Sequence, residues 1–284
     1  MADPVLIETA YRSAFAGALA LAFGGAPLGV LVIARRMSLM GDALSHGILP
    51  GAAIAYLLFG ADPAAMTIGA LGAGLLLAAL SSLLARSGRL PEDAAFAVFY
   101  LSALALGVLL MGGERDVDAL HELLFGAPGG LDATGVVISA VAATATLLSL
   151  ALFIRGFLAE SADPVFTRAL GIRGGGLHLL LMMLIALNLV AGFRAFGALM
   201  TVGLMMIPAA SARYWARGYG GQAGFAVLLS ALSSGAGLIL AARFRWEAGA
   251  VMVMCAAALF ATSALFGRVG GLLQNLPGRA HLEA

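Results

Sequence analysis

The sequence predicts an all-α, polytopic integral membrane protein with eight or nine transmembrane helices, and three observations support this prediction. Of its 284 residues, 62% are hydrophobic and only 11% are charged, whereas a soluble domain is about half apolar and a quarter charged. Nine apolar stretches reach or approach the roughly twenty residues that a helix needs to cross a bilayer. Strands of a transmembrane β-barrel would be about half as long and would alternate apolar with polar residues.

The nine stretches are separated mostly by short connections, and only His46 and His178 place an acidic, basic or histidine side chain inside them. Their richness in alanine and glycine favours close helix packing in lipid. The stretch at 195–212 is short and contains Pro208, so the number of crossings is eight or nine. The stretches span 13–34, 43–61, 64–85, 94–113, 133–154, 174–193, 195–212, 218–242 and 248–267.

The basic residues predict how the chain is oriented. All 16 are arginines, and basic residues favour the cytoplasmic side of a membrane. With the amino terminus outside, eleven arginines fall inside and five outside, which add up to the 16 present. The first apolar stretch follows an acidic lead-in and is too long for a signal-peptide core, so we expect it to be retained.

Composition also excludes several classes of protein. A net charge of +1, with scattered charges, provides no basic face for nucleic acid. The single cysteine, Cys255, cannot form an intrachain disulfide or a cysteine-based metal cage. The chain contains no lysine and therefore no phosphate-binding loop of the form G-x-x-x-x-G-K-[ST], so any ATP is hydrolysed by another subunit. A membrane-embedded metalloenzyme is a weaker alternative, because no H-E-x-x-H constellation is present.

We expect one transmembrane domain over residues 1–284, with two longer connections. The external loop at 114–132 is acidic. The internal segment at 156–173 is predicted to form a short cytoplasmic helix that opens after Asp163 and Pro164, with Ser161 as a cap. Such a helix could dock in a groove of a soluble partner, or it could lie on the lipid surface. Its apolar side comprises Val165, Phe166, Ala169 and Leu170.

Asp42 and His46 are the candidate metal ligands. They are four residues apart, so on a helix both side chains project from one face. A carboxylate oxygen with an imidazole nitrogen suits zinc, manganese or iron(II). Two ligands make a weak site that water, another helix or a second copy of the chain would complete. The alternative is that Asp42 favours the positive end of a helix and His46 bonds a carbonyl, although ionisable groups at membrane depth are costly and usually functional.

Four motifs, in order, resemble those of the metal-ion ABC transporter permease family. After the second motif this chain has APGG at 127–130, where family members often have a polar residue and leucines. The motifs are RRMSLMGDALSHGILPG at 35–51, LFG at 124–126, DPVFTRALG at 163–171, and FGAL at 196–199 followed by IPAASAR at 207–213.

This resemblance implies a permease subunit of an ATP-binding-cassette importer that moves zinc or manganese, or else iron, across the bacterial cytoplasmic membrane. The chain would be a transport subunit rather than an enzyme, with no permanently bound cofactor and with the metal ion as cargo. Its implied partners are a cytoplasmic ATPase, an extracytoplasmic metal-binding protein and a second copy of the permease. A permease for an iron chelate or cobalamin remains the alternative.

The resemblance also implies roles for individual residues. The metal-binding aspartate and histidine of the family fall on Asp42 and His46. The contacts with the ATPase fall on Asp163, Pro164, Phe166, Arg168, Ala169 and Gly171.

Overall fold

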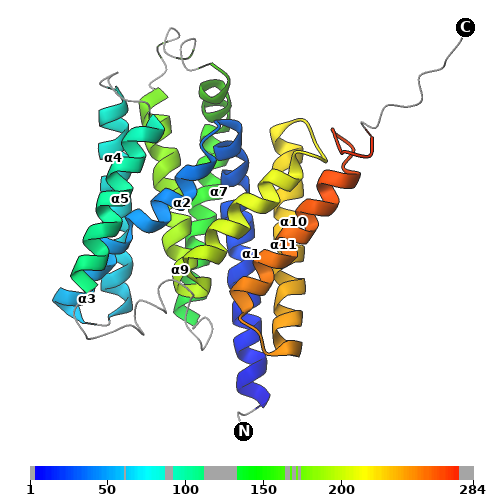
Figure 1. Ribbon diagram of the computed structural model, residues 1–284, viewed down its shortest axis with the longest axis horizontal. Coiled ribbons are helices and arrows are strands. Elements are labelled where there is room, and N and C mark those ends of the chain that lie inside the picture. The colour runs from blue at the N-terminus through cyan, green and yellow to red at the C-terminus, as the bar shows by residue number, and fades with distance from the viewer. Residues whose placement is uncertain are drawn as a thin grey trace, which may run out of the picture.

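The computed structural model describes residues 4–60, 62–86, 92–111, 133–163, 167, 171 and 174–274. The elements of this part are all helices, so the predicted all-α class is confirmed (Figure 1). They are α1 (Pro4–Ala34), α2 (Ser38–Gly47), α3 (Leu49–Phe59), α4 (Pro63–Arg86), α5 (Glu92–Met111), α7 (Ala133–Ala162), α9 (Gly174–Ala212), α10 (Tyr219–Phe244) and α11 (Ala248–Phe266).

Seven helical segments are long and apolar enough to cross a membrane, and the described residues contain two shorter apolar segments, Ala94–Leu110 and Phe196–Ala212. These nine segments match the nine predicted stretches one by one. One of them, Ser38–Phe59, comprises both α2 and α3. Figure 1 shows the start of α1 and the end of α11 at opposite ends of the helices, as an odd number of crossings requires.

The chain reverses direction inside α9, at Gly197. This residue has φ 77° and ψ 171°, a conformation that breaks a helix and favours glycine. In a straight helix, residues 192 and 201 would lie about 13 Å apart along the axis. A side-chain carbon at Gly192 would instead lie 2.6 Å from the Thr201 hydroxyl oxygen, so the two halves of α9 fold back on each other. The weakest of the predicted crossings, 195–212, is therefore a helix of its own.

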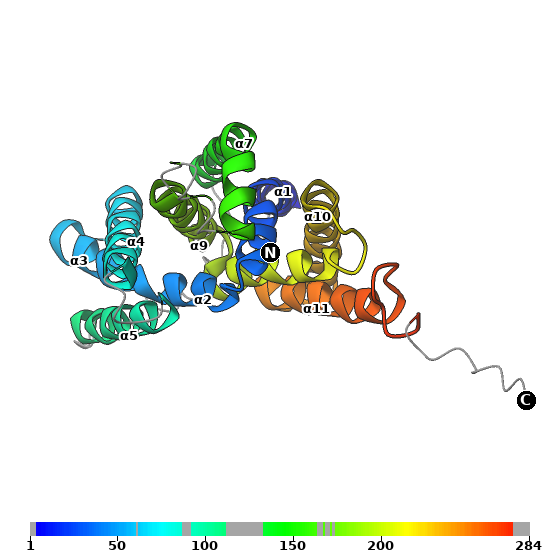
Figure 2. The same ribbon diagram turned by 90° about the horizontal axis from the view of Figure 1, so that it is seen from above.

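Helices α1 and α9 lie at the centre of the molecule. In the view from above, α3, α4 and α5 group on one side and α10 and α11 on the other (Figure 2). The largest buried cluster joins Leu31 of α1 and Leu44 of α2 to Ile185 of α9. Asn188 of α9 donates a hydrogen bond to Thr146 of α7 at 2.7 Å, the interhelical bond expected of a polar side chain in a membrane.

Helix α2 is short and is bounded by a break at each end. At its start, the chain leaves α1 through a turn in which Arg36 has φ 60°. The N–H of Arg36 donates to Ile33 at 3.1 Å and the N–H of Met37 donates to Val32 at 3.0 Å, which is the pattern of a Schellman motif. At its other end, Ile48 separates α2 from α3. Figures 1 and 2 show α2 running obliquely between α1 and the α3–α5 group.

Helices α3 and α4 cross at two glycines. A side-chain carbon at Gly69 would meet the carbonyl oxygen of Gly51 and would lie 2.8 Å from the Cβ of Ala55. A side-chain carbon at Gly51 would likewise meet the carbonyl oxygen of Gly69. Small residues at such a crossing let the two backbones approach closely, which is how helices in lipid gain packing contacts.

We predict that Gly69→Ala destabilises the folded protein by about 1–3 kcal/mol, because the added methyl group collides with backbone atoms of α3. Gly72→Ala on the same helix is the matched control, because nothing lies within 4 Å of a side-chain carbon at Gly72. Thermal unfolding of the purified protein in detergent measures both variants. Equal unfolding temperatures for the two would show that the crossing does not depend on the glycine.

Candidate functional site

One face of α2 is not packed against the rest of its own chain. Six of its ten residues are buried. The unpacked face contains Leu39, Asp42 and His46, which recur at the helical spacing of three and four residues. The exposed fractions are 80% for Leu39, 65% for the Asp42 side chain and 34% for the His46 side chain. The two predicted metal ligands therefore share one open face, as their spacing requires.

The side chains of Asp42 and His46 point toward the same space. Their nearest donor atoms, Asp42 Oδ1 and His46 Nε2, are 3.8 Å apart. Two ligands of a tetrahedral zinc ion, each about 2.0–2.1 Å from the metal, would be about 3.4 Å apart. Closing this gap takes a few tenths of an ångström, which small side-chain rotations provide. The pair can therefore bind one cation from one side and leave the other side open.

The other ring nitrogen of His46, Nδ1, is buried and has no hydrogen-bond partner among the described residues. A metal-binding histidine normally donates its second N–H to an oxygen atom, which fixes the orientation of the ring. The carbonyl oxygen of His46 accepts the N–H of Ile48. Pro50 has no N–H and cannot make the regular helical bond to that carbonyl. The break between α2 and α3 thus begins directly at the candidate ligand.

The second half of α9 supports α2 next to Asp42. Gly41 is buried, and a side-chain carbon at this position would lie 3.0 Å from the Cε of Met205 and 3.9 Å from the sulfur of Met206. The hydroxyl of Ser45 donates to the carbonyl of Asp42 at 2.6 Å within the helix. Gly41 and Ser45 are both buried and do not reach the open face. The backing side is thus packed, and only the open face is available to an ion.

Among the described residues, Asp42 and His46 have no third ligand nearby. Within the described part of the chain, no three histidine, cysteine, aspartate or glutamate residues gather closely enough to hold a metal ion. His178 lies near Arg35, with 3.5 Å between His178 Nδ1 and Arg35 Nη1. A complete ligand shell therefore needs donors from outside this arrangement.

The predicted cytoplasmic segment at 156–173 begins differently from our expectation. Helix α7 continues to Ala162, so residues 156–162 are its last turns. Ser161 does not cap a new helix. Its hydroxyl donates to the carbonyl of Phe157, one turn earlier, at 2.6 Å. The sequence pattern of a cap was misleading because a serine within a helix can make the same kind of bond to its own preceding turn.

Only two of the six residues assigned to ATPase contact fall within the described part of the chain. The carbonyl of Asp163 accepts the N–H of Thr167 at 3.1 Å and the hydroxyl of Thr167 at 2.8 Å. Gly171 has φ 76°, which favours glycine. Pro164, Phe166, Arg168 and Ala169 lie outside the described residues, as does the external loop at 114–132.

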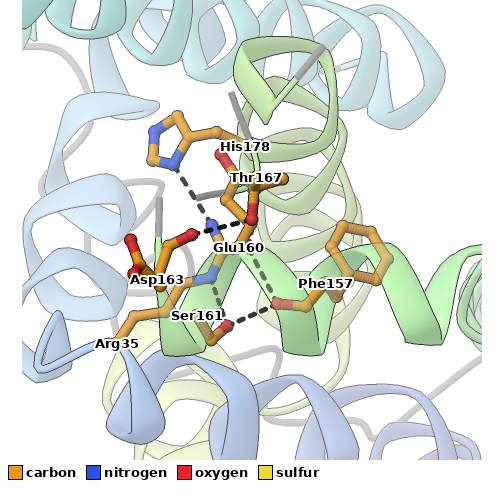
Figure 3. Close-up of polar contacts among 7 residues, drawn as sticks. All are labelled: Arg35, Phe157, Glu160, Ser161, Asp163, Thr167 and His178. Atoms are coloured by element: carbon orange, nitrogen blue, oxygen red, sulfur yellow. Dashed lines mark hydrogen bonds and ion pairs between the residues drawn. The ribbon is translucent and has the colours of Figure 1, made fainter. Parts of the chain in front are cut away.

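Sequence reasoning missed a polar network around Arg35. Its guanidinium group donates to Ser161 at 2.9 Å, to the carboxylate of Glu160 at 3.1 Å and to the carbonyl of Phe157 at 3.4 Å. Figure 3 shows these groups and His178 around the Arg35 side chain. Arg35 opens the motif at 35–51, but its partners are more than 120 positions away in the sequence. No local pattern signals such a pairing.

Residues 8–267 match the ABC 3 transport family. The chain belongs to this family. It is 31% identical to the manganese transport system membrane protein MntC of Halalkalibacterium halodurans, over 95% of this chain and 92% of that protein. It is 33% identical to the high-affinity zinc uptake system membrane protein ZnuB of Haemophilus influenzae, over 86% of this chain and 92% of that protein.

The fold agrees with that of a solved relative. The structure of PsaBC from Streptococcus pneumoniae in complex with Fab superposes with a TM-score of 0.81 at 30% identity, covering 93% of this chain and 94% of that chain. Membership of the ABC 3 transport family makes this protein a multi-span permease of the bacterial inner membrane and a transport subunit rather than an enzyme. The family also implies an ATPase subunit and a substrate-binding protein as partners.

We predict that a cysteine at Asp42 is accessible to water and a cysteine at Met40 is not. In a Cys255→Ser background, a hydrophilic maleimide should label Asp42→Cys at least about tenfold faster than Met40→Cys, because the reaction requires a hydrated thiolate. Met40 is only 2% exposed and lies two residues away on the same helix. The labelling rates of the two purified variants measure whether each position is accessible to water. Labelling of Asp42→Cys by a lipid-soluble maleimide alone would place this face against lipid instead.

Proposed function

We propose that this permease imports a bare divalent cation, manganese or zinc, and that Asp42 and His46 hold the ion during its passage. One observation supports this most directly. The only face of α2 that is not packed contains both side chains, 3.8 Å apart, inside a membrane-spanning segment. The names of the relatives add the class of cargo, since MntC is a manganese protein and ZnuB a zinc protein.

An exposed carboxylate inside an apolar span cannot face lipid at low cost, because charged groups in the bilayer core require water or a partner. The Asp42 side chain is 65% exposed, and Leu39 beside it is 80% exposed. A second copy of the chain, related by a two-fold axis near α2, would cover this face. Most soluble oligomers use such a two-fold arrangement, and the same geometry suits a permease that encloses a path between two copies.

The two-fold arrangement would also complete the ligand shell. Two copies of Asp42 and His46 supply two oxygen and two nitrogen atoms. Four ligands of this kind suit a tetrahedral zinc ion, and manganese would add water. Because each copy contributes only two ligands, separation of the copies releases the ion. Weak binding of this kind is what transport needs, since the ion must leave the site.

An iron chelate or cobalamin is a less suitable cargo. In a chelate the metal is already coordinated, so the path would have no use for an aspartate and a histidine that point into the same space. A buried imidazole nitrogen and a carboxylate in a membrane both raise the free energy of the folded state unless a ligand compensates. A bare cation that takes both side chains as ligands would compensate this free-energy cost.

We further propose that the segment after α7, from Asp163 to Gly171, docks on the ATPase. The N–H of Thr167 donates to the carbonyl of Asp163, and the motif DPVFTRALG contains apolar residues at helical spacing. A short amphipathic helix of this kind fits a groove on a soluble partner. The extracytoplasmic partner would deliver the metal ion to the opposite side of the membrane.

We predict that Asp42→Ala and His46→Ala each reduce metal uptake severely, by on the order of a hundredfold, because each removes one of few ligands. His46→Asn keeps a polar side chain of similar size but is a poor ligand, so it should be nearly as defective. Uptake of radioactive manganese and zinc into cells measures the effect. Ser38→Ala, an exposed change in the first turn of α2, is the control and should transport normally.

These variants should still be produced and should still assemble with the ATPase, because Asp42 and His46 do not belong to the packed side of α2. Normal uptake of both ions by the alanine variants would contradict the metal role. Normal uptake by His46→Asn alone would assign His46 to packing and leave Asp42 as the ligand.

We predict that Phe166→Asp uncouples transport, because it places a charge in an apolar protein contact, where it would be left without a partner. The permease should still insert in the membrane, while ATPase association and metal uptake both fall at least about tenfold. Phe166→Leu keeps the side chain apolar and is the matched control. Co-purification of the ATPase together with uptake measures both effects, and wild-type values for Phe166→Asp would assign the segment to the lipid surface.

A further inference from the structure

The Arg35 side chain is held by three groups of α7. It is only 7% exposed and its ion-pair partner Glu160 is 12% exposed. The guanidinium Nε donates to Ser161, and Nη2 donates both to Glu160 and to the backbone carbonyl of Phe157. Figure 3 shows the guanidinium enclosed by these acceptors on the last turns of α7, with His178 of α9 on its other side. Such a planar group with several donors is fixed in orientation as well as in position.

A buried ion pair is weak evidence for stability, because removing two charges from water costs about as much as their attraction returns. A role in fixing one particular arrangement is better attested for such pairs. The Arg35–Glu160 pair is therefore expected to fix the relative position of the two parts of the molecule that it joins.

The pair joins the two functional segments of the chain. Arg35 lies in the turn between α1 and α2, seven residues before Asp42. Glu160 lies three residues before Asp163, where the proposed ATPase-docking segment begins. Arg35 and Glu160 are 125 positions apart in the sequence, so the contact joins two segments that the chain itself does not connect closely. Glu160 is thus linked through one side chain to the start of the helix that bears the candidate metal ligands.

Helix α2 can respond to such a link as one body. It has ten residues. At its start Arg36 is left-handed, and at its end the regular hydrogen bonding is interrupted at Ile48, since Pro50 has no N–H for the His46 carbonyl. A hinge motion can be absorbed by only a few residues in a loop or at the end of an element. A displacement of the end of α7 would therefore pull on the Arg35 turn and tilt α2, together with Asp42 and His46.

We infer that Arg35 is a positioning residue, which transmits movement of the cytoplasmic end of α7 to α2 and so couples ATP hydrolysis to the geometry of the ion site. This inference rests on the proposed function of Asp42, His46 and the docking segment. It assigns to Arg35 no contact with the ion. Its effect passes through the ion pair with Glu160 and through the turn that Arg35 shares with α2.

The test uses the full transporter, with permease, ATPase and binding protein, reconstituted in liposomes. The variant is Arg35→Met combined with Glu160→Leu. Replacing both charges by apolar groups of similar size is often neutral for stability, whereas removing one charge leaves the other buried and unpaired. The double variant should assemble and hydrolyse ATP, but the number of manganese or zinc ions moved per ATP should fall about fivefold or more, the usual lower range of coupling between sites.

Two further variants sharpen the test. Arg36→Gln removes the same charge from the same turn, but Arg36 is exposed, so its coupling ratio should equal that of the wild type. Arg35→Lys keeps the charge but replaces the forked donor by a single ammonium group, so it should give an intermediate ratio. A merely structural role would lower the amount of assembled complex and leave the number of ions per ATP unchanged.

A wild-type coupling ratio in the assembled double variant would overturn the inference. Loss of assembly in the double variant, with a wild-type ratio in the fraction that assembles, would overturn it as well. The result is distinguishable from failure of the proposed function. If Asp42→Ala transports normally while the double variant is uncoupled, the metal assignment is wrong and the link is real. If Phe166→Asp still binds the ATPase, the docking segment is wrong whatever Arg35 does.

Discussion

The cost of an ionisable side chain in a lipid environment is the constraint on which the functional parts of this structure depend. A charge at membrane depth needs water, a ligand or an opposite charge. Arg35 lies in the turn between two spans, and its charge is compensated inside the protomer by Glu160, with Ser161 beside it. Asp42 lies within a span, and its side chain is largely exposed on the open face of α2. The charge of Arg35 is therefore satisfied within one chain, whereas we propose that an ion and a second copy of the chain satisfy Asp42.

Close helix packing places these groups. In lipid, helices gain no hydrophobic driving force from meeting each other, so small residues that allow close contact decide which helices pack together. Gly51 and Gly69 bring α3 against α4, and Gly41 brings α2 against the methionines of α9. The side of α2 that lacks such contacts is the side with Asp42 and His46. One short helix is therefore packed on one side and presents the two candidate ligands on the other.

Much of the fold could be predicted from the sequence, because a membrane span depends on a local property, the length of an apolar run. All nine predicted stretches correspond to helical segments. The pairing of Asp42 with His46 could also be predicted, since a spacing of four residues determines a shared helical face. The structure at the end of α7 could not be predicted. Ser161 fits a capping pattern by its neighbours in sequence, but it bonds to its own preceding turn and to Arg35, which lies 126 positions away.

The sequence by itself determined the membrane class, the approximate limits of the apolar stretches and the two candidate ligands, because each follows from residues within one or two turns of each other. Only the tertiary structure decided that Gly197 folds α9 back on itself, that α2 is a separate short helix with one open face, and that Arg35 connects its start to α7. These features depend on contacts between residues distant in the chain. In a uniformly apolar sequence, no local pattern specifies which helix faces which.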